Sequence, residues 1–164
     1  MKKLSIYILI LIPVSVFSQK NDDTTKSLLD SLSKNQIQYL CNGKITKYLD
    51  LYSNNYTDLG GGLKGDGTAD FNSWKEKLEK FISSEEFNEI EGKSIDEVLD
   101  VEKQEILNYY ETVKKKGEIK RFSFLLKEGD YLLSYPSKEG SPLSDGWFGI
   151  FRFENGDWKI IAGD

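Results

Sequence analysis

The feature that most constrains the fold is an Asn-Gly pair between two apolar runs near the C-terminal end. Residues 146–153 read Gly-Trp-Phe-Gly-Ile-Phe-Arg-Phe, residues 158–162 read Trp-Lys-Ile-Ile-Ala, and Asn155-Gly156 lies between them. A type I′ turn needs positive φ at both central residues, and Asn-Gly accepts this readily. The pattern therefore predicts a β-hairpin.

Two further apolar runs upstream extend this hairpin into a sheet. Residues 119–126 and 131–135 flank the tight connection Lys127-Glu128-Gly129-Asp130. Alternate apolar residues share one face of a strand, so one side of the sheet is expected to be apolar and rich in aromatic rings. We expect a four-stranded antiparallel meander whose apolar face carries Phe122, Phe124, Leu126, Tyr131, Leu133, Tyr135, Trp147, Phe151, Phe153, Trp158 and Ile160.

The residues before the sheet are predicted to be helical. Apolar residues recur at helical spacing in residues 24–41, and Asn42-Gly43 is typical of a helix end. Residues 44–56 are predicted to form a second helix, with capping boxes at Ser73–Glu76 and Ser94–Glu97 opening helices over 74–82 and 94–117. The fold class is therefore α+β, with N-terminal helices packed on a curved C-terminal antiparallel β-meander.

The first residues are predicted to be an export signal. Lys2 and Lys3 precede the apolar run 4–12, which is shorter than the roughly 20 residues of a spanning helix. We expect residues 1–18 to be a signal peptide cleaved near Ser18-Gln19, residues 19–25 a flexible mature terminus and residues 26–164 a single α+β domain. A bacterial periplasmic or secreted protein without stable membrane insertion follows; a retained membrane anchor is the alternative.

Charge and composition exclude several classes of function. Without Lys2 and Lys3 the chain has 20 basic and 27 acidic residues, a net charge of −7, which argues against nucleic acid as a partner. Histidine is absent, which removes Ser-His-Asp and Cys-His nucleophiles and the usual catalytic zinc sites. The single cysteine, Cys41, excludes an internal disulfide and is interpreted as a buried apolar residue, with an intermolecular disulfide as the alternative.

Three groups of residues are candidates for chemistry. Tyrosines at helical spacing in 45–56 suit either a ligand wall or ordinary core packing. Asp130, Asp145 and Asp157 are candidate general bases, or turn residues beside glycine. The glycine loop 60–67 lacks the Gly-Lys-Ser/Thr ending of a phosphate-binding loop. A calcium loop over Asp66, Asp70 and Asn72 would need glutamate where Lys77 stands. We therefore expect neither a cofactor nor a metal.

Two short motifs give the chain a resemblance to a known superfamily. Tyr48-Leu49-Asp50-Leu51-Tyr52-Ser53 and the terminal Gly156-Asp157-Trp158-Lys159-Ile160-Ile161 resemble segments of the nuclear transport factor 2-like (SnoaL/ketosteroid-isomerase-like) superfamily over residues 45–162. The resemblance implies a cone-shaped roll with a pocket at one end, in a superfamily of isomerases, dehydratases and binding modules. The chain departs from the superfamily in two ways. Only residues 87–91 offer a strand between the early helices. The dehydratases of the superfamily use histidine, which is absent here, and no catalytic residue carries over.

The leading hypothesis is a non-enzymatic exported domain that binds a small apolar or amphipathic ligand between helix and sheet. Its ligand-binding residues would be Tyr48, Tyr52, Trp74, Tyr131 and Trp147. The alternatives are a histidine-free isomerase or dehydratase that uses tyrosine and Asp/Glu, and a protein-interaction module of the cell envelope. A homodimer through the sheet is a further expectation.

Overall fold

The sheet is the centre of the fold, and it confirms the expected α+β class. The computed structural model describes residues 14–59, 69–115, 125–141, 143 and 146–163. Six strands pair in the order β2-β1-β6-β5-β4-β3, and every pair is antiparallel except β1 with β6. The strands are β1 (Tyr52–Asp58), β2 (Ala69–Asp70), β3 (Glu105–Asn108), β4 (Tyr131–Tyr135), β5 (Trp147–Glu154) and β6 (Asp157–Gly163).

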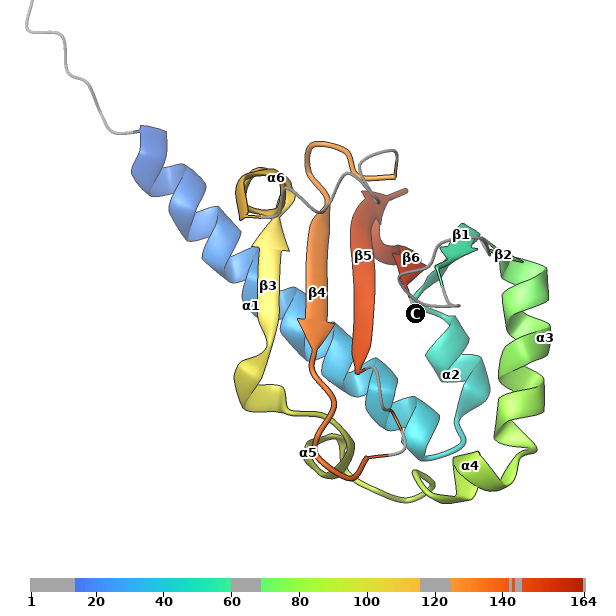
Figure 1. Ribbon diagram of the computed structural model, residues 1–164. Coiled ribbons are helices and arrows are strands. Elements are labelled where there is room, and N and C mark those ends of the chain that lie inside the picture. Colours follow the sequence, from blue (N-terminus) through green and yellow to red (C-terminus); the bar gives the residue numbers. More distant parts are fainter. Residues whose placement is uncertain (1–13, 60–68, 116–124, 142, 144–145, 164) are drawn as a thin grey trace, which may run out of the picture.

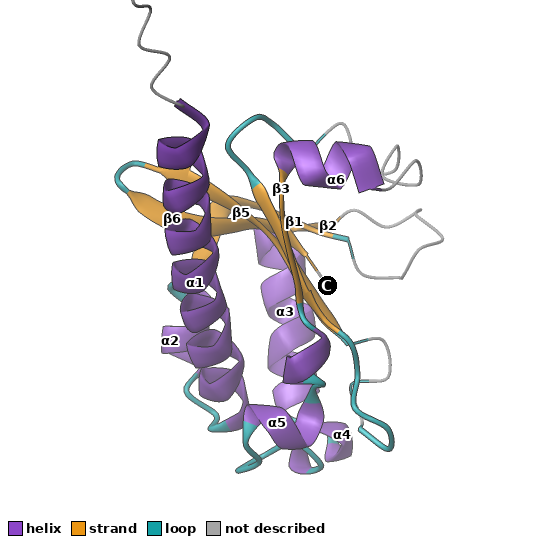
Figure 2. Ribbon diagram, turned by 90° about the vertical axis from the view of Figure 1, so that its left-hand side faces the viewer, coloured by secondary structure: helices purple, strands orange, loops and turns teal. Residues whose placement is uncertain are grey.

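Helices cover the two faces of the sheet unequally. Figure 2 shows a curved sheet with α1, α2 and α3 on one side and α6 on the other. The large core lies between the sheet and helices α1, α2 and α3. The smaller core lies on the opposite face and includes Leu132, Ile150 and Ile161. The helices are α1 (Val14–Cys41), α2 (Ile45–Leu49), α3 (Phe71–Ile82), α4 (Glu85–Asn88), α5 (Ile95–Val98) and α6 (Tyr109–Lys115), with a 3₁₀ turn at Val101–Lys103.

The predicted C-terminal hairpin is confirmed. Glu154 pairs with Asp157, which leaves a two-residue loop in which Asn155 has φ 53° and Gly156 has φ 89°. These angles are the ones a type I′ turn requires. Alternation is also confirmed on β4, where Leu133 lies in the large core and Leu132 in the smaller one.

Helix α1 is attached to β4 at two matched points. Tyr131 Oη donates to Asp22 Oδ1 at 2.7 Å, and Tyr135 Oη donates to Asp30 Oδ1 at 2.9 Å. Eight helical residues rise about 12 Å and four strand residues about 13 Å, so both bonds form along one straight contact. Asp22 and Asp30 are each also paired with the lysine four residues on.

The second predicted helix is wrong beyond Leu49. Helix α2 ends there, and β1 begins at Tyr52 beside β6. Residues four apart share a face in a helix and in a strand alike, so the spacing of Tyr48, Tyr52 and Tyr56 fitted both. Pairing with β6 decides the conformation, as Ile160 N donates to Leu51 O at 2.8 Å.

The predicted helix over 94–117 is also wrong. Its capping box forms, with Ser94 N donating to Glu97 Oε2 at 2.8 Å, but α5 ends at Val98 and β3 then pairs with β4. The fourth strand of the meander is therefore β3 and not residues 119–126, of which 119–124 lie outside the described residues and 125–126 are not in a strand.

Three smaller boundaries differ from the predictions. Helix α3 is capped by Asp70, whose Oδ1 accepts from Ser73 N at 2.8 Å, so Ser73 is not the N-cap. Residues 87–91 form the end of α4 and a turn instead of a strand. Helix α1 begins at Val14 instead of Thr24, so it includes residues 19–25; the cleavage near Ser18-Gln19 stays a prediction.

Candidate functional site

Four of the five predicted ligand-binding residues lie together on the concave side of the sheet. Tyr48 on α2, Tyr52 on β1 and Trp74 on α3 have ring centroids 4.3–6.1 Å apart, and each is at most 9% exposed. Tyr56 joins them with its ring centroid 4.8 Å from those of Tyr52 and Trp74. We call these four side chains and Trp147 the aromatic cluster.

Trp147, the first residue of β5, is the member of the cluster that the sheet contributes next to Tyr135. Its ring lies over Gly149, where an added Cβ would come within 3.0 Å of the Trp147 side chain. Trp147 also neighbours Tyr135, with ring centroids 5.9 Å apart. The absence of a side chain at Gly149 therefore leaves room for the indole of Trp147.

The hydroxyl groups of Tyr48 and Tyr52 lie in the protein interior. Tyr52 Oη donates to Tyr48 Oη at 2.7 Å, in a buried environment. Burial, with Tyr48 and Tyr56 alongside, raises the pKa of Tyr52 well above its usual value, while a hydrogen bond with Trp147 acts in the opposite direction. The Tyr52 phenol is therefore a neutral hydrogen-bonding group at ordinary pH.

Helix α1 adds polar groups to the same interior. Ser33 and Gln36 are both 0% exposed and lie on the helix face that also carries Leu29, Ile37 and Leu40. Ser33 Oγ and Tyr135 Oη are 2.9 Å apart, and Gln36 Nε2 donates to Tyr48 O at 3.2 Å. Burial is the main cause that raises the pKa of Tyr135, so that phenol is neutral too.

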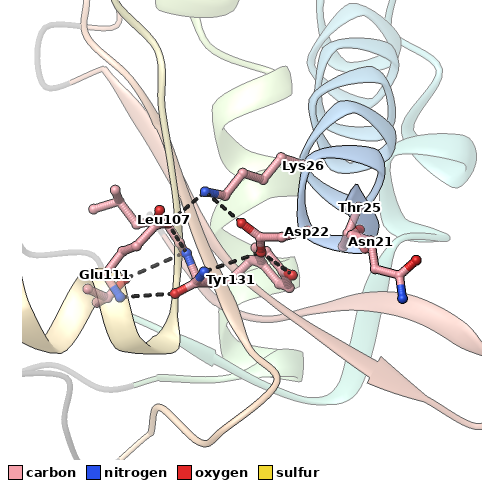
Figure 3. Close-up of polar contacts among 9 residues, drawn as sticks. Asn21, Asp22, Thr25, Lys26, Leu107, Glu111 and Tyr131 are labelled. Carbon is pink, nitrogen blue, oxygen red and sulfur yellow. Dashed lines mark hydrogen bonds and ion pairs between the residues drawn. The ribbon is translucent and has the colours of Figure 1, made fainter. Parts of the chain in front are cut away.

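Tyr131, the fifth predicted residue, lies elsewhere. Its hydroxyl joins a polar group formed by α1, β3, β4 and α6 (Figure 3). Asp22 accepts from Tyr131 at 2.7 Å and from Asn108 Nδ2 at 3.2 Å, and Lys26 Nζ lies 3.0 Å from Asp22 Oδ2 and 2.7 Å from Glu111 Oε2. The Tyr131 ring packs on Trp158, with centroids 5.6 Å apart, and not on the aromatic cluster.

The charges of this polar group stabilise the contact between α1 and β4. Burial and the bond to Asp22 raise the pKa of Tyr131 to about 12. Burial opposes ionisation of Asp22, but its hydrogen bonds with Tyr131, Lys26 and Asn108 together lower its pKa. The Tyr131 hydroxyl already donates its hydrogen bond to the Asp22 carboxylate. This arrangement suits docking of α1 better than binding of a further molecule.

The candidate bases are also engaged in structure. Asp130 is 1% exposed; Arg152 Nε donates to its Oδ1 at 2.8 Å and Arg152 Nη2 to its Oδ2 at 2.6 Å. Asp157 is exposed and caps its own turn by accepting from Trp158 N at 2.9 Å. Asp145 lies outside the described residues. Among the described carboxylates, Asp58 is also buried, and its Oδ2 lies 2.7 Å from Lys77 Nζ.

Metal-binding clusters and membrane-spanning helices are both absent from the residues that the structure describes. No group of three or more Asp, Glu or Cys side chains there is arranged to hold a metal ion. Asp70, considered for a calcium loop, serves as the cap of α3. Within the same residues, no helix combines the length and the apolar character needed to cross a membrane.

Sequence reasoning missed the buried polar residues of α1. Ser33 and Gln36 recur with the apolar residues of that helix at i, i+4, i+7, i+8 and i+11 from Leu29. That spacing was the available signal, because it places two polar side chains on the buried face. Comparison with known proteins adds no assignment: no protein-family model matches the chain, and no curated protein does.

Proposed function

We propose that this chain is an exported, non-enzymatic domain that binds a small apolar or amphipathic molecule on the concave side of its sheet. The site would lie between α2 and the sheet, with Tyr48, Tyr52, Trp74 and Trp147 as walls. Tyr131 supports α1 instead of touching the ligand. The resemblance to the nuclear transport factor 2-like superfamily remains part of this proposal, since there too helices lie on the concave face of a curved sheet.

The observation that carries the proposal is the set of buried polar groups among the aromatic rings. A buried hydroxyl or amide costs free energy unless it is bonded, so a core that only packs carries few such groups. Sites for small molecules combine apolar walls with a few placed polar groups. The groups in question belong to Ser33, Gln36, Tyr48, Tyr52 and Tyr135.

The first test is native mass spectrometry of residues 19–164 purified from a periplasmic fraction. We expect an excess mass that disappears on denaturation. The same protein is then titrated with N-phenyl-1-naphthylamine, a neutral dye that brightens in apolar surroundings. A bare protein that also leaves the dye dark would contradict the proposal.

Matched tryptophan variants locate the site. Trp147 belongs to the aromatic cluster, whereas Trp158 lies on the same face of the sheet beside Tyr131. We expect Trp147→Phe to lower the affinity for the dye and Trp158→Phe to leave it near the wild-type value. Equal affinities of the two folded variants would place binding away from the cluster. Tyr48→Ala should likewise lower affinity by more than its loss of stability explains.

An interaction module of the cell envelope is the second candidate. Phe153 is 58% exposed at the end of β5, and its ring packs on Trp158 with centroids 5.5 Å apart. Exposed aromatic groups of this kind are frequent at protein interfaces. In the mass spectrum, a bare species at twice the chain mass would favour this candidate and the homodimer through the sheet.

A histidine-free enzyme of the isomerase or dehydratase type is the third candidate. It needs a carboxylate beside the tyrosines, and Asp58 follows Tyr56 by two residues on β1 and is 2% exposed. Its pairing with Lys77 favours a structural role. Proton exchange into a bound carbonyl compound that Asp58→Asn abolishes would favour the enzyme.

A further inference from the structure

We infer that the molecule bound at the aromatic cluster is neutral and carries a hydrogen-bond donor, which it gives to Gln36 Oε1. The inference rests on the proposed function and adds the chemical class of the ligand. It depends on one atom, the side-chain oxygen of Gln36, and on the charges around it.

The orientation of the Gln36 amide is set by the backbone of α2. Its Nε2 lies 3.2 Å from Tyr48 O, which accepts hydrogen bonds and cannot donate. The amide oxygen must therefore point away from that carbonyl. Gln36 Oε1 is buried and has no hydrogen-bond partner among the described residues.

The neighbours of Gln36 place this oxygen at the candidate site. Ser33, one helical turn earlier, contacts Tyr135 Oη, and Tyr135 packs against Trp147. On the other side Gln36 contacts the backbone of Tyr48, whose ring belongs to the aromatic cluster. Side chains three apart on a helix are neighbours, so Gln36 lies between the α2 and β5 sides of the cluster.

A buried acceptor without a partner calls for a donor. Nearly all buried polar atoms in folded proteins are bonded, to protein, water or ligand. A hydroxyl or N–H group of the ligand would satisfy Gln36 Oε1, whereas an ether or a ketone would face it with a second lone pair. The site therefore selects a donor, and sites built to bond a hydroxyl reject analogues that lack it.

The charges near the cluster exclude an anion. No lysine or arginine is among the buried residues that the structure describes, so a buried carboxylate or phosphate would find no cation there. Lys77, beside the cluster on α3, is paired with Asp58 and lies largely in solvent. A buried cation is disfavoured as well, because Asp58, the buried carboxylate on β1, is already paired with Lys77.

The test uses three probes of one shape, titrated against wild-type residues 19–164 by calorimetry. They are 2-naphthol, which donates; 2-methoxynaphthalene, which only accepts; and 2-naphthoate, an anion. We expect 2-naphthol to bind at least about tenfold more tightly than either of the others. The amide resonance of the Gln36 side chain should shift with 2-naphthol and stay in place with the ether.

Two variants on the same helix provide the control. Gln36→Met keeps the length of the side chain and removes the acceptor. Gln38→Met makes the same change at an amide already satisfied at both ends, by Lys93 O at 3.0 Å and by Ile95 N at 3.2 Å. We expect the tenfold preference to vanish in Gln36→Met and to persist in Gln38→Met, with near-ultraviolet circular dichroism confirming the fold of both.

The outcomes separate the two proposals. If wild-type protein binds naphthol and ether equally, or the naphthoate most tightly, the inference is overturned, while small-molecule binding stands; a buried water would then serve Gln36 Oε1. If the naphthol preference survives in Gln36→Met, the donor contacts another group and the inference again fails. If no probe and no dye binds, the proposed function itself falls.

Discussion

Removing the two tyrosine hydroxyls that hold α1 against β4 tests how that helix is attached. Tyr135→Phe deletes bonds to Asp30 and Ser33 without creating a cavity. Ser33 Oγ keeps Leu29 O at 2.8 Å and Asp30 keeps Lys34 at 2.8 Å, so neither partner is stranded. A hydrogen bond to a charged group contributes roughly 1.5–3 kcal/mol, and water can reach Asp30, so we expect a loss of about 1.5 kcal/mol.

Tyr131→Phe should cost less, about 1 kcal/mol, because Asp22 keeps Lys26 and Asn108. The two sites are about 13 Å apart along β4, so their effects should add to about 2.5 kcal/mol. Tyr110→Phe is the control, since its hydroxyl bonds Glu128 on the surface and the side chain is 62% exposed.

The assay is urea unfolding followed by tryptophan fluorescence, supported by thermal melts, where 1 kcal/mol corresponds to about 2–4 °C for a chain of this size. If Tyr135→Phe lost no more stability than Tyr110→Phe, the docking argument for α1 would be refuted. If the double variant lost much less stability than the sum of the two single losses, both bonds would break together, with α1 moving as one body.

Three further changes have expected outcomes. Asp130→Asn should cost about 2–3 kcal/mol in urea unfolding, less than for a fully buried pair because the Arg152 side chain is 22% exposed; a neutral result would mean that the pair adds nothing. Gly163→Ala should cost about 2 kcal/mol, because its Cβ would lie 2.5 Å from the carbonyl oxygen of Phe148, and a melting temperature equal to wild type would contradict that contact. The pKa of Tyr131 rises in the folded protein from 10 to about 12, so the stability it contributes is complete below pH 10 and is lost as pH rises to 12. Between pH 10 and pH 12, wild-type protein should therefore lose more stability than Tyr131→Phe does. The difference should be smaller than the ~2.7 kcal/mol that two pKa units represent, since the ring is half-buried. Parallel stability curves of the two proteins would speak against a raised pKa of Tyr131.

Local signals in the sequence predicted the elements that local chemistry decides. The Asn155-Gly156 turn, the end of α1 at Cys41 before Asn42-Gly43 and the capping box at Ser94 all depend on residues within a few positions of one another. The strands β1 and β3 were missed because pairing with β6 and β4 overrides the local pattern. Tertiary contact, not propensity, decides such segments.

The candidate site was predicted in part for the same reason. The tyrosine spacing in residues 45–56 pointed to a shared face, which survives the change from helix to strand because Tyr48, Tyr52 and Tyr56 still converge. The separation of Tyr131 from that group depends on Asp22, more than a hundred residues away in the chain. No pattern within one segment carries such information.

The position of β6 has a consequence for the order in which the protein folds. This strand follows the other five described strands in the chain, yet it lies in the sheet between β1 and β5. Until β6 is available, β1 and β5 each lack a neighbour, and the two parts of the sheet cannot join. Contacts between distant segments of this kind slow folding. During synthesis from the N-terminus, the sheet would therefore stay divided between β1 and β5 until β6 emerged and joined the two parts.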